Sequence, residues 1–203
     1  WGFEHAIRGM RNPLNSWNKS DSTIDMIQGY KVDYHIGEND LDLMRRLYKA
    51  GTEHRKYLRQ IFVSMDITAP LYYWTEADTY KIGITRNSCS KMHKITSKEI
   101  TLSDFSCDDF EIEDITLKDY FINVVADCES LRQKFLKTKD KRYWKGLIQL
   151  LPESYNQKAT ITMNYENVIT IIKQRTGHKL TEWRDFIDIL KDLPYIKEII
   201  GEN

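Results

Sequence analysis

Apolar residues recur every three or four positions in several parts of the chain, which is the spacing of one face of an α-helix. The first such part begins at Asn39 or Asp40, either of which can cap a helix. Its positions on one face are Leu43, Leu47, Ala50, His54, Leu58 and Ile61. The pattern predicts one helix over residues 39–61. It places His54 on the apolar face, where a core role and a ligand-binding role are both open.

The second half of the chain contains further helical patterns and one alternating segment. Helices are predicted over residues 117–135, 143–151, 166–175 and 179–190, the second of which stops before Pro152. Residues 158–165 alternate between polar and apolar, which predicts a strand. The β-branched and aromatic run 61–74, broken by Pro70, fits a strand, a helix or both. We therefore expect an α/β or α+β fold, a single domain over residues 1–203 with a small mixed or antiparallel sheet flanked by several helices.

Two segments show little periodicity. Residues 1–38 are rich in Asn, Ser, Gly and Asp and are expected to form a loop-rich N-terminal segment with turns or a short strand. Arg8 and Arg11 stand there near Trp1 and Trp17, which fits either a surface loop or a substrate-facing loop with arginine donors. Residues 104–119 are acidic and mixed, and predict a surface excursion of turns and short helix.

Composition narrows the class of protein. The 203 residues carry 30 basic and 30 acidic side chains, a balance that argues against a nucleic-acid-coating protein but permits a local basic pocket. Cys89, Cys107 and Cys128 have neither CxxC nor metal-finger spacing, so we expect no metal site and a reducing compartment. No apolar run is long enough to span a bilayer and no signal-peptide pattern is present, so we expect a cytoplasmic protein without a membrane partner.

One segment gathers side chains that suit a phosphate group. Hydroxyls and amides can bond phosphate oxygens, and Lys and Arg supply the countercharge. These residues are Arg86, Asn87, Ser88, Ser90, Lys91, His93 and Lys94. The composition fits a phosphate site and also a solvated turn. Cys89 and His93 would form a thiol–imidazole pair only if the segment were helical, because residues four apart then share a face.

The last predicted helices carry a second group of charged residues. Arg175 stands near a helix C-terminus, where the helix dipole favours a cation. Glu182 and Arg184 are two positions apart and project to different sides of their helix. One of the two could belong to a site while the other forms a structural ion pair.

Taken together, these pieces stand in the order found in the flavin-dependent thymidylate synthases. That family has a Glu-His pair on a helix, then a strand, a helix and an Arg-rich signature that ends in Asn-Glu-x-Ser-x-Arg-Tyr. A Leu-Pro segment, a strand with an Asn, a helix ending in Arg and a helix with Ala-Gln-x-Glu-Ile-Arg follow. The corresponding residues here are Glu53-His54, residues 87–93, Leu151-Pro152, Asn164, Arg175 and residues 180–184. By order and spacing, the chain resembles this family over about residues 40–190.

The resemblance implies a homotetramer whose subunits together hold FAD and deoxyuridine monophosphate. Such enzymes move a carbon from methylenetetrahydrofolate to uracil C5 with the help of the reduced flavin. By position, the cofactor-binding residues would be His54, Lys81 and Asn87. The substrate-binding residues would be Arg86, Ser88, Ser90, Lys91, His93, Arg175 and Arg184.

The sequence departs from the family pattern in the groups that hold phosphates. The family's Arg-His-Arg falls within residues 75–83, where Lys81 is the only basic residue. The signature's final Arg-Tyr is Met92-His93, which removes a bidentate phosphate donor, and the Ala-Gln of the last motif is Lys179-Leu180. Two further readings therefore stay open: a catalytically degenerate nucleotide-binding protein on the same scaffold, as in a phage or defence system, and an unrelated helical interaction domain.

Overall fold

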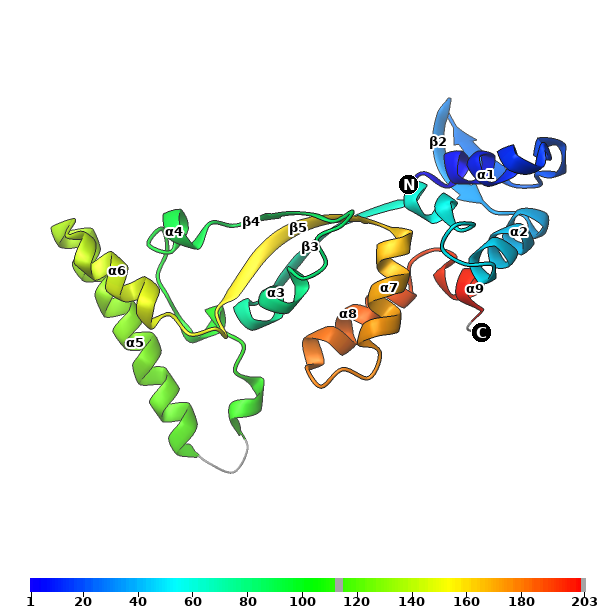
Figure 1. Ribbon diagram of the computed structural model, residues 1–203. Coiled ribbons are helices and arrows are strands. Elements are labelled where there is room, and N and C mark those ends of the chain that lie inside the picture. The colour runs from blue at the N-terminus through cyan, green and yellow to red at the C-terminus, as the bar shows by residue number, and fades with distance from the viewer. Residues whose placement is uncertain (112–114, 202–203) are drawn as a thin grey trace. The chain divides into compact units, whose positions relative to one another are not determined.

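A computed structural model describes residues 1–111 and 115–201 (Figure 1). The helices in these ranges are α1 (Phe3–Arg11), α2 (Glu38–Lys49), α3 (Leu71–Ala77), α4 (Lys91–Lys94), α5 (Ile115–Thr138), α6 (Lys141–Leu150), α7 (Tyr165–Arg175), α8 (Thr181–Lys191) and α9 (Ile196–Ile200). The strands are β1 (Thr23–Ile27), β2 (Tyr30–His35), β3 (Phe62–Pro70), β4 (Thr85–Ser88) and β5 (Asn156–Asn164). Short 3-10 turns cover Asn12–Leu14, Trp17–Lys19, Lys56–Gln60, Leu102–Asp104 and Asp108–Glu111.

The chain forms a mixed α/β fold with two small sheets. β1 and β2 make an antiparallel hairpin. β3, β5 and β4 form a second sheet in that order. Ser64 bonds Thr162, and Thr160 donates to Asp66, so the partner numbers fall along β5 as they rise along β3 and these strands are antiparallel. The expected fold class, with a small antiparallel sheet and several helices, is confirmed.

The chain divides into two compact units. Unit 1 comprises Trp1–Ser64, Lys81–Thr85 and Thr162–Asn203, and unit 2 comprises Met65–Tyr80 and Arg86–Ile161. Because the boundaries fall inside the strands of the β3-β5-β4 sheet, each of these strands contributes residues to both units.

Unit 1 is organised around a buried carboxylate. Asp40 is fully buried and accepts hydrogen bonds from Arg11 Nε at 2.5 Å, from Ser20 Oγ at 2.6 Å and from Ser22 Oγ at 2.7 Å. Burial alone would raise the pKa of Asp40, but these three hydrogen bonds outweigh it, and the pKa is lowered. The carboxylate thereby ties α1 and the following loop to α2. The apolar core beside it includes Met44, Leu58, Val168, Trp183, Leu190 and Ile196.

Unit 2 has its own apolar core, to which α5, α6 and the preceding loop contribute. α5 and α6 pack against each other (Figure 1). The core residues are Ile95, Ile100, Phe105, Val125, Cys128 and Leu147. Glu129 on α5 joins this core to the preceding loop. Its carboxylate accepts two hydrogen bonds from Arg132 and one from the backbone N–H of Ile100.

The predicted helix over residues 39–61 is wrong in its second half. α2 ends at Lys49, and Gly51 follows with φ 110°, a left-handed conformation that glycine adopts without steric penalty. His54 therefore lies in an exposed turn. This exposure excludes the core role considered for His54. The apolar spacing that suggested a core role continued by chance across the break.

The prediction of a loop-rich segment over residues 1–38 is also partly wrong. Residues 3–11 form α1, which buries Ala6, Ile7, Met10 and Arg11 and exposes His5 and Arg8. Nine residues are too few for a clear helical period, and the polar composition concealed the helix. The predicted turns and short strand correspond to the 3-10 turns and the β1–β2 hairpin.

The other predicted elements are found with small shifts in their bounds. The helices over 117–135, 143–151, 166–175 and 179–190 are α5, α6, α7 and α8, and the strand over 158–165 is β5. The ambiguous run 61–74 forms both a strand and a helix, β3 followed by α3 at Pro70. Of the predicted excursion 104–119, the described part has 3-10 turns and the start of α5, and residues 112–114 lie outside the described ranges.

None of the helices within the described ranges has the length and apolar character needed to cross a membrane. In the same part of the chain, no three His, Cys, Asp or Glu side chains come together as potential metal ligands.

Candidate functional site

The predicted phosphate-binding segment forms β4 and the short helix α4 in unit 2. Ser90 caps α4, because its hydroxyl oxygen accepts a hydrogen bond from the backbone N–H of His93 at 3.3 Å. The N–H of Cys89 donates to the Lys158 carbonyl at 2.9 Å, and Gln157 Nε2 donates to the Cys89 carbonyl at 2.6 Å. These bonds to β5 fix the backbone that presents Ser90 and Lys91.

Ser90 and Lys91 line a cavity of about 340 Å³ that lies within unit 2. Its wall combines lysines with hydroxyl groups from three separate parts of the chain. The lining residues are Thr68, Cys89, Ser90, Lys91, Lys94, Ile95, Ser97, Lys98, Ser103, Asp104, Tyr155, Asn156, Gln157 and Lys158. Burial raises the pKa of Tyr155, so this phenol keeps its proton and can donate a hydrogen bond at neutral pH.

The cavity contains more positive than negative charge. Lys98 pairs with Asp104, and Lys158 pairs with Asp66 at 2.8 Å. Lys91 and Lys94 have no carboxylate partner among residues 1–111 and 115–201. Two ammonium groups beside several hydroxyl donors form an arrangement that suits an anion such as a phosphate group.

Arg86 is held by Trp74 on α3 and by Asp78, which follows that helix. Its Nη2 donates to Asp78 at 3.0 Å, and the guanidinium lies 4.7 Å from the ring centre of Trp74. Its Nη1 is buried and has no hydrogen-bond acceptor among the described residues. A buried donor without a partner is energetically unfavourable, so an acceptor oxygen from a ligand would stabilise this arrangement.

The considered Cys89–His93 pair does not have the geometry that it requires. Cys89 precedes the cap residue Ser90 and lies outside α4, so it does not share a helix face with His93. Cys89 is exposed, as is His93. The helical premise of the pair is therefore wrong, because the helix begins two residues after the thiol.

The remaining predicted site residues lie in unit 1 and fall in three places. His54 lines a cavity of about 480 Å³ whose walls include Leu14, Leu47 and Tyr57, with Lys56 also on its lining. Glu53 also lines this cavity and pairs with Lys56 at 3.8 Å, so the two charges balance and the apolar wall suits a planar ring.

Lys81 is exposed. It lies between α3 and β4 in a short segment, Lys81–Thr85, that belongs to unit 1. This segment is fastened to the start of α7, because Asn167 Nδ2 donates to the Ile82 carbonyl at 2.8 Å. Gly83, whose φ is +77°, lies against the side chains of Asn164 and Asn167 at the start of α7.

Arg175 and Arg184 have local partners near α8. The Arg175 guanidinium lies 4.7 Å from the ring centre of Trp183, and its Nη1 is 3.1 Å from His178 Nε2. Arg184 donates to the Thr181 hydroxyl at 2.9 Å. The stacked position of Arg175 on a buried indole gives it a structural contribution in addition to any contact with a ligand.

The structure thus brings together six of the predicted residues, over 86–93, within unit 2, and Ser90 and Lys91 share a cavity. Sequence reasoning missed Lys98, Tyr155 and Lys158, which complete that cavity from the following loop and from β5. The alternation of β5 could have indicated which of its side chains share a face, but not the strand it pairs with.

Comparison with solved structures gives the same fold for a known group of enzymes. The flavin-dependent thymidylate synthase ThyX from Helicobacter pylori, complexed with FAD and dUMP, matches all of this chain and 94% of its own, with a TM-score of 0.71 and 16% identity. A second structure of that enzyme with FAD and dUMP, described at 2.31 Å resolution, also has a TM-score of 0.71 and 16% identity, with 93% of its chain covered. The two proteins share a fold. No protein-family model matches the sequence, and no curated protein is similar to it in sequence.

Proposed function

We propose that this chain is a flavin-dependent thymidylate synthase-like enzyme that acts on a pyrimidine deoxynucleotide at uracil C5. The deoxynucleotide phosphate would bind in the unit 2 cavity, with Lys91 and Lys94 as countercharges and the Ser90 hydroxyl as a donor. The observation that carries the proposal is this cavity, in which two of the four ammonium groups have no carboxylate partner in the described chain. The shared fold of enzymes solved with FAD and dUMP supports the same ligand class.

Arg86 would add a second contact to the nucleotide. Its buried Nη1 has no acceptor among the described residues, whereas its Nη2 is fixed by Asp78. A donor that is already positioned loses little entropy when a ligand oxygen arrives. Arg86 thereby takes over part of the role of the arginine that is missing at Met92.

FAD is the cofactor that this proposal requires. His54 and the apolar wall beside it fit the flavin ring, and the exposed Lys81 is a cation of unit 1 that could pair with its diphosphate. When bound, the flavin would supply the redox chemistry of transferring a one-carbon unit, with methylenetetrahydrofolate as the donor. The chain's own residues would bind and orient the ligands.

A homotetramer in the cytoplasm belongs to the same proposal. α5 exposes Leu117, Tyr120 and Ile122, with Tyr120 72% exposed, and such apolar surface favours association between copies. Cys89, Cys107 and Cys128 all carry free thiols, which suits a reducing compartment.

A second candidate function is a catalytically degenerate nucleotide binder on the same scaffold. The observation that favours it is the Lys81 segment, where the exposed Ile82 stands beside a single cation. A flavin diphosphate carries two negative charges and gains little from one screened lysine. This candidate keeps the unit 2 cavity and loses FAD, as a phage or defence protein could.

Substitution of the unpaired lysines tests the nucleotide site. Lys91→Gln and Lys94→Gln should each weaken binding of dUMP about tenfold, because a charge-assisted contact to phosphate is lost. Titration calorimetry of the full chain gives the affinities. Lys137→Gln, which removes an exposed lysine at the end of α5, is the matched control and should leave the affinity unchanged. Equal affinities for all three variants and the unsubstituted chain would place the nucleotide elsewhere.

A further inference from the structure

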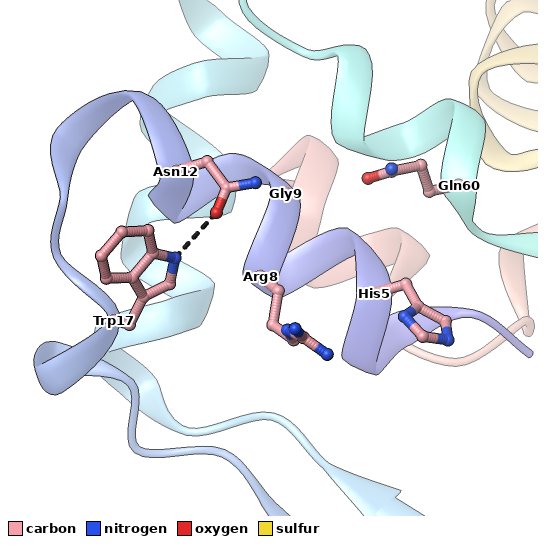
Figure 2. A pocket seen from close by; sticks show the side chains of 6 residues that line it. All are labelled: His5, Arg8, Gly9, Asn12, Trp17 and Gln60. Atoms are coloured by element: carbon pink, nitrogen blue, oxygen red, sulfur yellow. Dashed lines mark hydrogen bonds between the residues drawn. The ribbon is translucent and has the colours of Figure 1, made fainter.

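A second groove in unit 1 follows one face of α1. His5, Arg8, Gly9 and Asn12 are spaced three or four residues apart and therefore share a side of the helix. Trp17 and Gln60 complete the lining, and the groove encloses about 760 Å³. Figure 2 shows the Trp17 ring and His5 toward opposite ends, with Arg8 between them in this view. None of these residues belongs to the nucleotide cavity of unit 2.

The groove adjoins the cavity beside His54. Both are lined by Gly9, Asn12 and Gln60. The Gln60 side chain lies against the helix at Gly9, where a Cβ atom would stand 2.5 Å from its Oε1. The absence of a side chain at position 9 therefore allows the Gln60 amide to approach the helix and form the boundary of both spaces.

Arg8 gives the groove an available positive charge. Its guanidinium is exposed, and across residues 1–111 and 115–201 it has neither a carboxylate partner nor a hydrogen bond. Arg11, one turn further, is buried and bonded to Asp40, so the two arginines of this helix have different roles. His5 is exposed on the same side, and the described lining contains no acidic residue. This part of the groove favours an anion.

Trp17 supplies a planar surface beside that charge. Its side chain is 52% exposed. Its Nε1 donates to Asn12 Oδ1 at 2.8 Å, which holds the ring in one orientation (Figure 2). The Asn12 amide nitrogen and the Gln60 amide lie on the lining as further polar groups. An oriented indole next to amides is a surface on which a nucleobase stacks.

We propose that this groove binds a nucleoside monophosphate. The base stacks on Trp17, the phosphate pairs with Arg8 and His5, and the amides of Asn12 and Gln60 meet the polar edge of the base. The site is separate from the deoxynucleotide cavity and its existence does not depend on the proposed enzyme activity.

Titration of the full chain with AMP tests the site. Arg8→Gln should weaken AMP binding about tenfold because the charge-assisted contact is lost. Trp17→Ala should weaken it by a similar factor because the stacking surface is lost. Far-UV circular dichroism should be unchanged in both variants, since the two side chains are exposed. Adenosine and inorganic phosphate should each bind more weakly than AMP.

Two controls make the result specific to the groove. Lys19→Gln removes an exposed cation two residues from Trp17 that does not line the groove, and should leave AMP binding unchanged. Lys137→Gln, which removes an exposed lysine of unit 2 that lines neither cavity, should also leave it unchanged. AMP binding that is absent, that is insensitive to Arg8→Gln and Trp17→Ala, or that falls equally in Lys19→Gln would overturn the proposal.

A free nucleotide and the adenylate half of FAD present the same chemistry to the groove, and titration of Arg8→Gln with FAD separates them. A lowered FAD affinity identifies the adenylate half of the dinucleotide as the occupant. An unchanged FAD affinity, together with weakened AMP binding, identifies a free mononucleotide.

Discussion

At the scale of single residues, a partly buried carboxylate affects the stability of unit 2 in acid. In unit 2, Glu129 accepts hydrogen bonds from Arg132, from Gln133 and from the N–H of Ile100. The bonds from Arg132 lead in lowering the pKa of Glu129 to about 2, against a smaller opposing effect of burial. A carboxylate with a lowered pKa stabilises the folded state above its unfolded pKa, and this contribution is lost as the pH falls through the folded pKa.

Glu129→Gln should therefore lower the free energy of unfolding by about 2 kcal/mol at neutral pH, because Arg132 loses its charged partner. The deficit should shrink as the pH falls from about 4.5 toward 2, the range between the unfolded and folded pKa values. Urea unfolding of both proteins across this range measures the difference. A deficit that stays constant with pH would show that the ionised carboxylate does not stabilise unit 2.

The sequence indicates the types of residue in the candidate site, but not the tertiary contacts that these residues make. The cluster from Arg86 to Lys91 could be recognised because its hydroxyls and cations are contiguous. The sequence could not show which lysines are available to a ligand, since the pairing of Lys98 with Asp104 and of Lys158 with Asp66 depends on tertiary contacts. For the same reason, the sequence alone could not show that Arg8 and Arg11 lie in different environments.

At the scale of elements, the N-terminus of α7 holds the segment that contains Lys81. Asn164 and Asn167 form a reciprocal capping box, and Asn167 also bonds the Ile82 carbonyl. A Cβ atom at Gly83 would meet Asn167 Oδ1 at 2.9 Å and Asn164 Nδ2 at 3.1 Å. The glycine is thus required both by its backbone conformation and by the close approach of the cap.

Gly83→Ala should lower the free energy of unfolding by about 1 kcal/mol more than Gly177→Ala does. Gly177 has a nearly equal φ of +75° but open space around it, so it isolates the cost of the backbone conformation. The additional loss of free energy of unfolding in Gly83→Ala measures the cost of displacing the cap of α7. Thermal unfolding of the two variants gives the comparison, and equal losses would mean that the cap relaxes without cost.

Elements with a long or regular pattern were predicted well, and short or interrupted ones were not. α5 has 24 residues and several helical periods, and β5 alternates over its whole length. The prediction that the helix continues past Lys49 was wrong, because one glycine ends the helix although the apolar spacing goes on. α1 was missed because nine residues are too few to show a clear helical periodicity. α9 is shorter still, and its start at Tyr195 has a left-handed conformation that composition does not reveal.

At the scale of the whole molecule, the order of weak motifs indicated a fold that composition and periodicity alone left as an α/β class. The solved thymidylate synthase structures confirm that fold over the full chain at 16% identity. A shared fold fixes the order of the elements along the chain, whereas most side chains differ at 16% identity. The function carried by those side chains is for this reason a proposal.

The central claim is that this fold holds FAD together with a pyrimidine deoxynucleotide. The most direct test mixes the purified chain with FAD and then measures absorbance and mass during gel filtration. The account predicts that oxidised-flavin bands elute with the protein, at the mass of four chains, and that added dUMP perturbs those bands. A colourless monomer that binds dUMP without retaining FAD would contradict the flavin-dependent enzyme and favour the degenerate nucleotide binder.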